Sequence, residues 1–556
     1  MARLDRMEGG RQVAQLASAL GREFGHELLA AVANLDEPAL EAELTALVRA
    51  EILSPKGPPP RCSYIFKHAL LEDALYNSLV KGKRQQFHQR IAEALEAQFR
   101  QTVETRPELL AHHFTEAGLT KQAITYWLRA GLRSCERSAN VEAIGHLTTG
   151  LALLGKLEES TDRDAQELRF LNPLGTAYIA SRGYAAPEVA PVFRRARALC
   201  ERGGEPQEWF VTMYGNWAYH MVRGDLRLCM DLAAEAMEFA ERLKEPGLLM
   251  EALVLPAVTR LFRADFVGAR DCFERALSNY EDRARCAYWL RYTGADAGVS
   301  HRVCLSPTLW HLGFPDRALQ LSREACELGR QIRHPFSLCA ALYRVNQVFQ
   351  NCRLAAEALA ASEEQMRLAT EQGFLWFLPT GTIYRGAALL LLGRLQEALP
   401  VLLKGLDAYR ATGSALLLPY YYSMVGDAYT QAGRFGEALR SLDEGLALVE
   451  KNDDHSQEAE LHRQKGELFL AESPDQVGAA EHCFRQAIDT ARRQQSRAWE
   501  LRATMSLARL WQRQGRRDEA RAALAAVYGT FTEGFTTPDL VDAAAQLRRD
   551  RMQSRS

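Results

Sequence analysis

The sequence predicts an all-α protein, a superhelix of helical hairpins that repeat about every 40 residues, with a small winged-helix domain before it. Residues 392–399 (LGRLQEAL) are answered 40 positions later by residues 432–439 (AGRFGEAL). A chain of 556 residues would ordinarily divide into several globular domains. Its only Pro-rich linker is at residues 54–60. A stack of repeats explains both facts, because it grows without deepening its core.

Each copy of the repeat has the pattern of a helical hairpin. An apolar helix ends at Gly393 or Gly433, and glycine readily takes the left-handed conformation of a helix C-cap. The second helix carries Ala398 or Ala438 where two helices must approach closely. The other close-contact and bulky positions are Gly386, Leu389, Leu402, Gly405, Gly426, Tyr429, Leu442 and Gly445. Small and large residues at this spacing are typical of tetratricopeptide-type repeats.

The same turn recurs along the chain. It is marked by Gly224, Ala264, Gly313, Arg353, Gly393, Gly433, Gly478 and Gly515. From Gly313 to Gly515 the mean spacing is about 40 residues. Two earlier turns, near residues 118 and 138, are only about 20 apart. One helix near Trp127 is therefore expected to close one hairpin and open the next.

The first hundred residues have a different pattern. It predicts helices at 13–20, 27–32 and 37–50, extended pieces at 52–53 and 64–66, and helices at 68–80 and 83–99. Asp36 is the expected N-cap of the third helix, with Pro38 in its first turn. Three helices followed by a small hairpin form a winged-helix arrangement. The predicted organisation is a tail (1–10), the winged-helix-like domain with its following helices (11–100), crowded first repeats (101–200), the repeat superhelix (201–530), and a capping helix with a tail (531–556).

Composition excludes several classes of partner. Hydrophobic residues make up 47% and charged residues 25% of the chain, and the formal net charge is −2, so no global field attracts nucleic acid or an acidic membrane. The apolar run at 387–392 is far shorter than the roughly 20 residues that span a bilayer. The N-terminal residues lead into no signal-peptide core, so we expect a cytoplasmic protein. Eleven cysteines without a CxxC pair predict free buried thiols.

Seven short segments, specific as a set, extend over nearly the whole chain. They are residues 16–24, 64–74, 108–114, 183–189, 334–338, 458–463 and 531–535. Together they resemble the winged-helix and tetratricopeptide-repeat region of bacterial multidomain signal-transduction ATPases, many of which carry an adenylate or guanylate cyclase domain. The chain has no G-x-x-x-x-G-K-[ST] phosphate loop and no segment that fits a cyclase domain. The resemblance therefore implies the regulatory half of that architecture.

The resemblance also implies a role for His68. In the related ATPases, a histidine at the start of the helix after the wing reaches the phosphates of the bound nucleotide. Residues 66–68 (FKH) resemble that position. An imidazole N–H at a helix N-terminus is well placed to donate to a phosphate oxygen. The alternative is that His68 is a structural residue at the end of a helix.

No constellation of residues predicts catalysis or a metal. Among the 13 histidines the densest group is His112 and His113, close to Glu116. Adjacent residues on a helix point about 100° apart, so these two are not expected to share one metal ion. For His301 and His311 we expect packing or capping roles. No Ser/His/Asp or Cys/His signature occurs in a suitable context, so we expect no catalytic residue, no cofactor and no enzyme activity.

The repeat register predicts a binding surface on the concave face of the superhelix. The candidate residues are Tyr343, Gln347, Gln350, Ile383, Leu390, Tyr420, Ser423, Asp427 and Gln431. Aromatic and amide groups suit a peptide or a small polar ligand. The alternative for each residue is packing against the next repeat or exposure to water. Near the C-terminus we expect a solvated face, or one that meets an acidic protein, formed by Arg485, Arg492, Arg493, Arg497, Arg502, Arg509, Arg513, Arg516 and Arg517.

The predicted function is a non-catalytic sensor and interaction scaffold of a bacterial signalling system, which binds a protein, a peptide or a small ligand. One alternative is the regulatory part of a cyclase or signalling ATPase whose catalytic domains lie outside this chain, with such a domain as the partner. Another is a winged-helix DNA-binding regulator. Helix 37–50 opposes this, because it sets Glu37, Glu41 and Glu43 against Arg49 alone, and phosphate repels an acidic helix.

Overall fold

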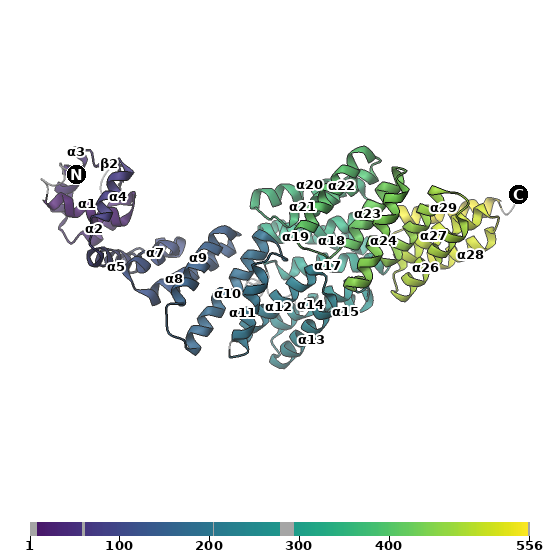
Figure 1. Ribbon diagram of the computed structural model, residues 1–556, viewed down its shortest axis with the longest axis horizontal. Coiled ribbons are helices and arrows are strands. Elements are labelled where there is room, and N and C mark those ends of the chain that lie inside the picture. The colour runs from purple at the N-terminus through teal and green to yellow at the C-terminus, as the bar shows by residue number, and fades with distance from the viewer. Residues whose placement is uncertain (1–7, 58–61, 204, 279–293, 554–556) are drawn as a thin grey trace. The chain divides into compact units, whose positions relative to one another are not determined.

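The computed structural model describes residues 8–57, 62–203, 205–278 and 294–553. These residues form 28 helices and three short strands (Figure 1), which confirms the predicted all-α class. The chain divides into two compact units. The N-terminal unit comprises Met1–Ser134 with Glu142–Phe170, and the repeat unit comprises Cys135–Val141 with Leu171–Ser556.

The N-terminal unit begins with three helices and a small sheet. Its elements are α1 (Glu8–Leu20), β1 (Glu23–Gly25), α2 (His26–Ala33), α3 (Glu37–Arg49), β2 (Leu53–Lys56), β3 (Ser63–Phe66), α4 (Ala69–Asn77), α5 (Lys81–Gln98), α6 (Arg100–Thr105), α7 (Pro107–Ala117), α8 (Thr120–Glu136) and α9 (Asn140–Leu154). The side chain of Asp36 accepts from the backbone N–H of Ala39 at 3.0 Å, so the predicted N-cap is confirmed.

The sheet is antiparallel with strand order β1-β3-β2. Phe24 pairs with Tyr64, and Leu53 pairs with Phe66. The hairpin lies where the sequence predicts it, but strand β1 was not predicted. Three residues carry too little periodicity to indicate a strand, and β1 is fixed only by pairing with a strand about 40 positions downstream.

Helix α8 packs on both of its neighbours in this unit, as expected for a helix shared between two hairpins. The indole Nε1 of Trp127 donates to the hydroxyl of Thr115 on α7 at 2.9 Å. On the other side, its ring lies 5.5 Å from that of His146 on α9. At Gly131 a Cβ atom would come 2.4 Å from Leu147, so the approach to α9 requires a glycine.

The repeat unit is a series of antiparallel hairpins. After α10 (Thr161–Arg182), which begins in the other unit, its elements are α11 (Val189–Cys200), α12 (Pro206–Arg223), α13 (Leu226–Leu243), α14 (Pro246–Phe262), α15 (Phe266–Ser278), α17 (Ala297–His311), α18 (Pro315–Gln331), α19 (Pro335–Asn351), α20 (Ala355–Gln372), α21 (Phe377–Leu391), α22 (Leu395–Ala411), α23 (Leu418–Gln431), α24 (Phe435–Asn452), α25 (Glu458–Glu472), α26 (Val477–Arg493), α27 (Arg497–Arg513), α28 (Arg517–Tyr528) and α29 (Pro538–Gln553).

Small residues allow close packing within each hairpin. A Cβ atom at Gly386 would lie 2.8 Å from Cγ of Leu402, and one at Gly426 would lie 2.7 Å from Leu442. Ala398 and Ala438 are both fully buried in the second helices. The predicted pattern of small and large contact positions is therefore confirmed in the hairpins α21–α22 and α23–α24.

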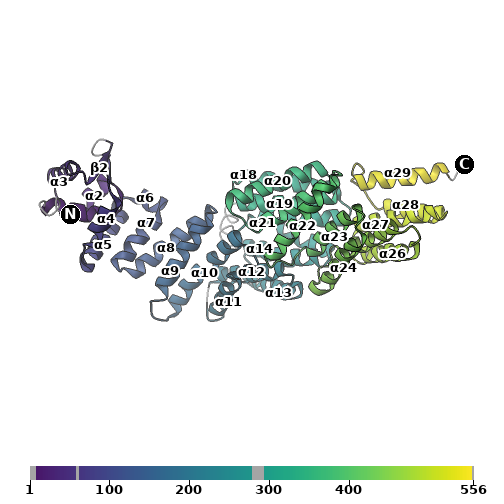
Figure 2. The ribbon, with the colours of Figure 1, turned by 45° about the horizontal axis from the view of Figure 1, so that its top comes forward.

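The repeat unit also contacts itself across about 190 residues of sequence. The backbone N–H groups of Ala415 and Leu416 both donate to the carbonyl of Val222, at 2.8 and 3.0 Å. One repeat further on, Ser456 N donates to Phe262 O at 3.1 Å. Figures 1 and 2 show α12 to α15 beside the later hairpins. The superhelix is therefore wound tightly enough for one turn to pack on the next.

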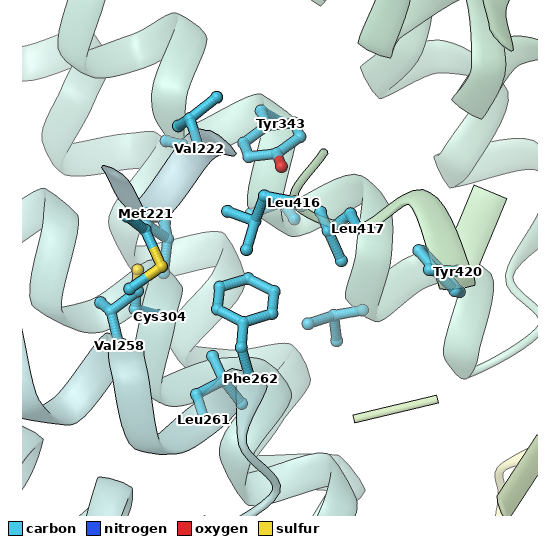
Figure 3. Close-up of a cluster of buried hydrophobic side chains, with 14 of the residues drawn as sticks. Met221, Val222, Val258, Leu261, Phe262, Cys304, Tyr343, Leu416, Leu417 and Tyr420 are labelled. Atoms are coloured by element: carbon cyan, nitrogen blue, oxygen red, sulfur yellow. The ribbon is translucent and has the colours of Figure 1, made fainter. Parts of the chain in front are cut away.

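This winding fills most of the inner face that the sequence analysis expected to be open. Leu416 and Leu417, from the loop before α23, are buried beside Met221, Val222 and Phe262 (Figure 3).

The ten described cysteines are free thiols, as predicted, and most of them are buried; Cys286 lies outside the described residues. No helix in the described ranges is long and apolar enough to cross a membrane.

Candidate functional site

A groove remains on the inner face of the repeat unit, with a volume of about 380 Å³. We call it the inner groove. Its walls come from α19, α21, α23, α25 and α27, with α29 at one edge. The polar residues that define it are Gln350, Asn351, Arg353, Tyr420, Ser423, Asp427, Glu460, Arg463, Gln464, Arg502, Arg509, Asp539 and Asp542.

Arg463 is the centre of an ion-pair cluster in this groove. Its Nε and Nη2 atoms each lie 2.7 Å from an oxygen of Glu460, so the pair is bidentate. Glu467 accepts from Arg509 at 2.7 Å and lies 3.5 Å from Arg463. Burial alone would lower the pKa of Arg463, but the two carboxylates raise it above its usual value. This part of the groove therefore contains ionised side chains whose opposite charges balance one another.

Arg502 fixes the next part of the groove. Its guanidinium carbon lies 5.2 Å from the ring centre of Trp310 and 5.0 Å from that of Trp499, within the range of cation–π contacts. The same group forms an ion pair with Asp539 at 2.8 Å and donates to the carbonyl of Asn351. Arg502 thus joins four helices at the groove wall.

Two amide groups in the groove each have one atom without a hydrogen-bond partner among the described residues. Asn351 is only 2% exposed, and its Oδ1 accepts from the hydroxyl of Tyr420 at 3.2 Å. Its Nδ2 has no acceptor, and the buried Oε1 of Gln464 has no donor. A buried polar atom left without a hydrogen bond costs roughly 1–3 kcal/mol. Nearby, burial raises the pKa of Asp427, whose carboxylate accepts from Gln431 at 3.2 Å.

The nine residues expected on the concave face have separate locations. Five of them line the inner groove, and these are Gln350, Leu390, Tyr420, Ser423 and Asp427. Tyr343 lines a second, smaller cavity, and Gln347 is buried with an unpartnered Oε1. Gln431 is exposed.

Ile383 does not lie on the inner face. It is fully buried, and a Cβ atom at Gly405 would come 2.7 Å from its Cγ1. Ile383 therefore belongs to the contact between α21 and α22. The 40-residue spacing identifies the position of Ile383 within its repeat. It does not determine which face of the helix carries the side chain.

Sequence reasoning missed most of the charged groove residues, although the repeat carries a signal for them. Forty positions after Tyr420, Ser423 and Asp427 stand Glu460, Arg463 and Glu467, and 42 positions later stand Arg502, Met505 and Arg509. Extending the register by one and two repeats would have found them. The interpretation of the C-terminal arginines as a uniformly solvated face is wrong for Arg502, whose side chain is only 15% exposed.

His68 lies in the N-terminal unit as the N-cap residue of α4. Its backbone is extended, with φ −128° and ψ 120°, and its side chain makes no capping hydrogen bond. The residue is exposed. The imidazole is therefore accessible at a helix N-terminus, and its role as a nucleotide sensor stays a prediction.

A histidine cluster lies elsewhere in this unit. One ring nitrogen each of His88, His112 and His113 lies within 4.8 Å of the others, closer than the sequence argument on adjacent residues anticipated. Nδ1 of His88 is 2.8 Å from Nδ1 of His113, and Nε2 of His88 is 2.9 Å from the Tyr76 hydroxyl. Tyr76 in turn donates to Glu116 at 3.3 Å. Both nitrogens of His88 are thus engaged in a hydrogen-bond chain, and we assign the cluster a structural role.

Known proteins resemble this chain at low sequence identity. No family model matches the chain. It is 24% identical over 533 residues to an uncharacterized protein of Rhizobium meliloti (strain 1021). That alignment covers 92% of this chain and 49% of the relative, so the chain spans about half the length of the curated protein it matches.

Solved structures show only weak likeness. A Rap protein complexed with competence and sporulation factor is 12% identical, with a TM-score of 0.46 over 70% of this chain and all of that one. A signal-transduction ATPase with a tetratricopeptide repeat sensor from Pyrococcus horikoshii is 11% identical, with a TM-score of 0.30 over 94% of this chain and 63% of that one. Both scores are too low to identify a function.

Proposed function

We propose that the repeat unit is a non-catalytic scaffold that binds an extended peptide segment of a protein partner in the inner groove. The observation that supports this most directly is the pair of unpartnered amide atoms, Nδ2 of Asn351 and Oε1 of Gln464. A peptide group offers one carbonyl acceptor and one N–H donor. Both atoms are buried beneath the groove surface, so an extended segment would satisfy them with its backbone after the two side chains turn toward the groove.

The charges of the groove indicate which side chains such a peptide would carry. Arg353 and Arg509 are partly exposed at its edges, with side chains 43% and 45% accessible, and Asp542 is 52% accessible. Arg463 and Glu460 between them are neutralised by each other. Arg353 is paired with Asp542 and Arg509 with Glu467, so the groove edges present charges of both signs. This favours a peptide with both acidic and basic side chains over nucleic acid, which requires a field of a single sign.

The groove proposal is tested with a peptide array and then with labelled peptides in solution. We expect Asn351→Ala and Gln464→Ala each to weaken binding about fivefold to tenfold, which corresponds to roughly 1–1.5 kcal/mol for one hydrogen bond. Gln396→Ala removes an exposed amide of α22 outside the groove lining and should bind as the wild type does. Unchanged affinity in both groove variants would exclude the inner groove as the binding site.

For the N-terminal unit we propose a regulatory role next to a separate ATPase or cyclase domain. Three helices with an antiparallel sheet in the order β1-β3-β2 support a winged-helix assignment. A relative about twice as long aligns with nearly the whole chain, which supports an architecture with further domains. His68, exposed at the start of α4, is the candidate contact to bound nucleotide.

The regulatory proposal is tested by adding a separately expressed ATPase domain of the related signalling proteins. Complex formation with ADP should differ from that with ATP, and His68→Ala should abolish the difference. Identical binding by wild type and variant in both nucleotides would leave His68 as a structural residue.

A gel shift and an ATP-hydrolysis assay on this chain should both be negative. For DNA, the reason is that α3 presents exposed Glu37 and Glu41 to any duplex.

A further inference from the structure

A second cavity lies in the core of the repeat unit, apart from the inner groove. Its volume is about 120 Å³, and it is bounded by α12, α14, α17, α19 and the segments that precede α21 and α23. Its walls are mainly aromatic and aliphatic, with Tyr184, Tyr214, Trp217, Tyr343 and Trp376 among them. Figure 3 shows Tyr343 and Leu416 on one side of this region and Met221 and Val258 on the other. We call it the core cavity.

One charged side chain lines the core cavity. Arg344 on α19 is 8% exposed and is the one arginine that is buried as a whole residue within the described ranges. Its guanidinium carbon lies 5.0 Å from the ring centres of both Phe262 and Tyr343. It forms no ion pair with any described carboxylate, and its Nη1 has no hydrogen-bond partner there. The hydroxyl of Tyr343 interacts with that of Tyr421, but neither hydroxyl has a well-formed hydrogen bond to a described residue.

Among the described residues, Arg344 lacks the carboxylate partner that the arginines of the inner groove have. Arg463 has Glu460 at 2.7 Å, and Arg502 has Asp539 at 2.8 Å. A buried cation without such a partner is strongly unfavourable, and cation–π contacts offset only part of this cost. The position of Arg344, whose polar contact within the chain is the Cys304 thiol, therefore favours a bound anion beside its guanidinium.

Two buried carboxyl groups occur in the same core, but neither forms an ion pair with Arg344. Burial and the nearby Asp296 raise the pKa of Glu251 to about 8, so this side chain is largely uncharged at neutral pH. Burial raises the pKa of Asp454 to about 6, and its Oδ1 accepts from the hydroxyl of Ser456 at 2.7 Å. In the part of the chain that the structure describes, Oε1 of Glu251 and Oδ2 of Asp454 have no hydrogen-bond partner, but no ion pair joins either carboxyl group to Arg344.

We infer that the core cavity binds a small organic anion, a monocarboxylate with an aromatic or branched aliphatic body, through the guanidinium of Arg344. The planar guanidinium matches a carboxylate with two parallel hydrogen bonds, and the Tyr343 hydroxyl can add a third. The aromatic walls suit a ring of that size, since an engineered cavity of roughly 150 Å³ accommodates benzene. This inference is independent of peptide binding in the inner groove.

The test is calorimetric titration of the full chain with three ligands of equal size, which are benzoate, benzyl alcohol and benzylamine. The wild type should bind benzoate at least tenfold more tightly than benzyl alcohol and should not bind benzylamine. Arg344→Met should abolish the preference for benzoate over the alcohol. The matched control is Arg385→Met, which removes an arginine of α21 that pairs with Glu363 at 3.5 Å outside the cavity. It should bind as the wild type does.

Two further variants keep the test decisive if Arg344→Met does not fold. Arg344→Lys retains the charge without the planar fork, and should bind benzoate more weakly than the wild type while still preferring it to benzyl alcohol. Ala218→Leu fills the cavity, whose wall includes Ala218, and should exclude benzoate although Arg344 is intact. Equal binding of benzoate and benzyl alcohol by the wild type, or binding of neither, would overturn the inference. The inference would also be overturned if a folded Arg344→Met chain still preferred benzoate to benzyl alcohol.

Discussion

Three arginines that look alike in the sequence have three different environments. Arg463 is neutralised by Glu460, Arg502 is stacked between two tryptophans and paired with Asp539, and Arg344 is buried with no carboxylate partner. Each stands on the first helix of a hairpin, so helical periodicity assigns them similar positions. Glu460 is on the same helix as Arg463, but Asp539 reaches Arg502 from a later element, and no described carboxylate reaches Arg344 from another repeat. Long-range packing of that kind is not encoded in local pattern.

The histidine pair in the N-terminal unit gives a prediction at the same scale. Burial, together with nearby positive groups, lowers the pKa of His88 to about 4 and that of His113 to about 3. Both are therefore neutral in the folded chain at pH 5, whereas the unfolded chain binds protons below about pH 6.5. Because the unfolded state binds more protons in this window, stability falls as the pH is lowered from 6.5 toward 4.

The measurement is hydrogen exchange of α5 and α7, corrected for the intrinsic rate. We expect the free energy of opening to fall by about 3–4 kcal/mol between pH 7 and pH 5, which is roughly 2 kcal/mol from each imidazole. The double variant His88→Gln/His113→Gln should lose most of this pH dependence. His112→Gln, which alters the exposed member of the cluster, should retain it. A wild-type opening energy that does not change over this range would contradict the assignment of two buried neutral imidazoles.

At the scale of elements, local pattern predicted the hairpins well and their loops poorly. The glycine-ended turns and the small residues at 398 and 438 are sufficient to define hairpins, because both act between neighbouring helices. The sequence analysis did not use the loop residues Leu416 and Leu417, which are buried against an earlier turn of the superhelix. Two apolar residues in a loop already suggested that this loop is buried. The sequence does not reveal which residues cover it, because those partners stand about 190 positions earlier.

The hairpin contact at Ala438 gives the prediction for this scale. Its Cβ is fully buried where α24 packs on α23, so a larger side chain must push the helices apart. We expect Ala438→Trp to destabilise the repeat unit by about 1–3 kcal/mol through overpacking. Arg440→Trp places the same side chain at an exposed position on α24 and should have little effect.

Hydrogen exchange shows where the damage from Ala438→Trp falls. Protection should be lost first in α23, α24 and α25, because these helices contact one another directly. The N-terminal unit should keep its protection, since it folds around separate contacts. If protection is lost uniformly along the chain, the hairpins are not the local units of stability that the repeat implies.

At the scale of the whole repeat unit, contacts between successive turns decide how the site is built. Arg263 pairs with Asp453 at 2.6 Å, Arg317 pairs with Glu533 at 2.9 Å, and Arg353 reaches Asp542 at 2.7 Å. Members of each pair are separated by about 190 to 220 positions. An open superhelix would expose a long concave surface. This one leaves the inner groove and the core cavity among the spaces that its packing does not fill.

The contact between turns gives the last prediction. Leu416 and Leu417 are 3% and 0% exposed, and they lie against Met221, Val222 and Phe262 of the earlier turn (Figure 3). Replacing both by alanine removes this packing, and each buried Leu→Ala change costs roughly 2–5 kcal/mol. If the turns support one another, exchange should increase in α12 and α14 as well as in α23. Leu446→Ala is the matched control, because Leu446 packs within the local cluster of Ala438, Leu442 and Leu461, and its effect should stay in α24 and α25. Unchanged protection of α12 and α14 in the double variant would show that the two turns are not held together in solution, and both the inner groove and the core cavity would then be wider than described.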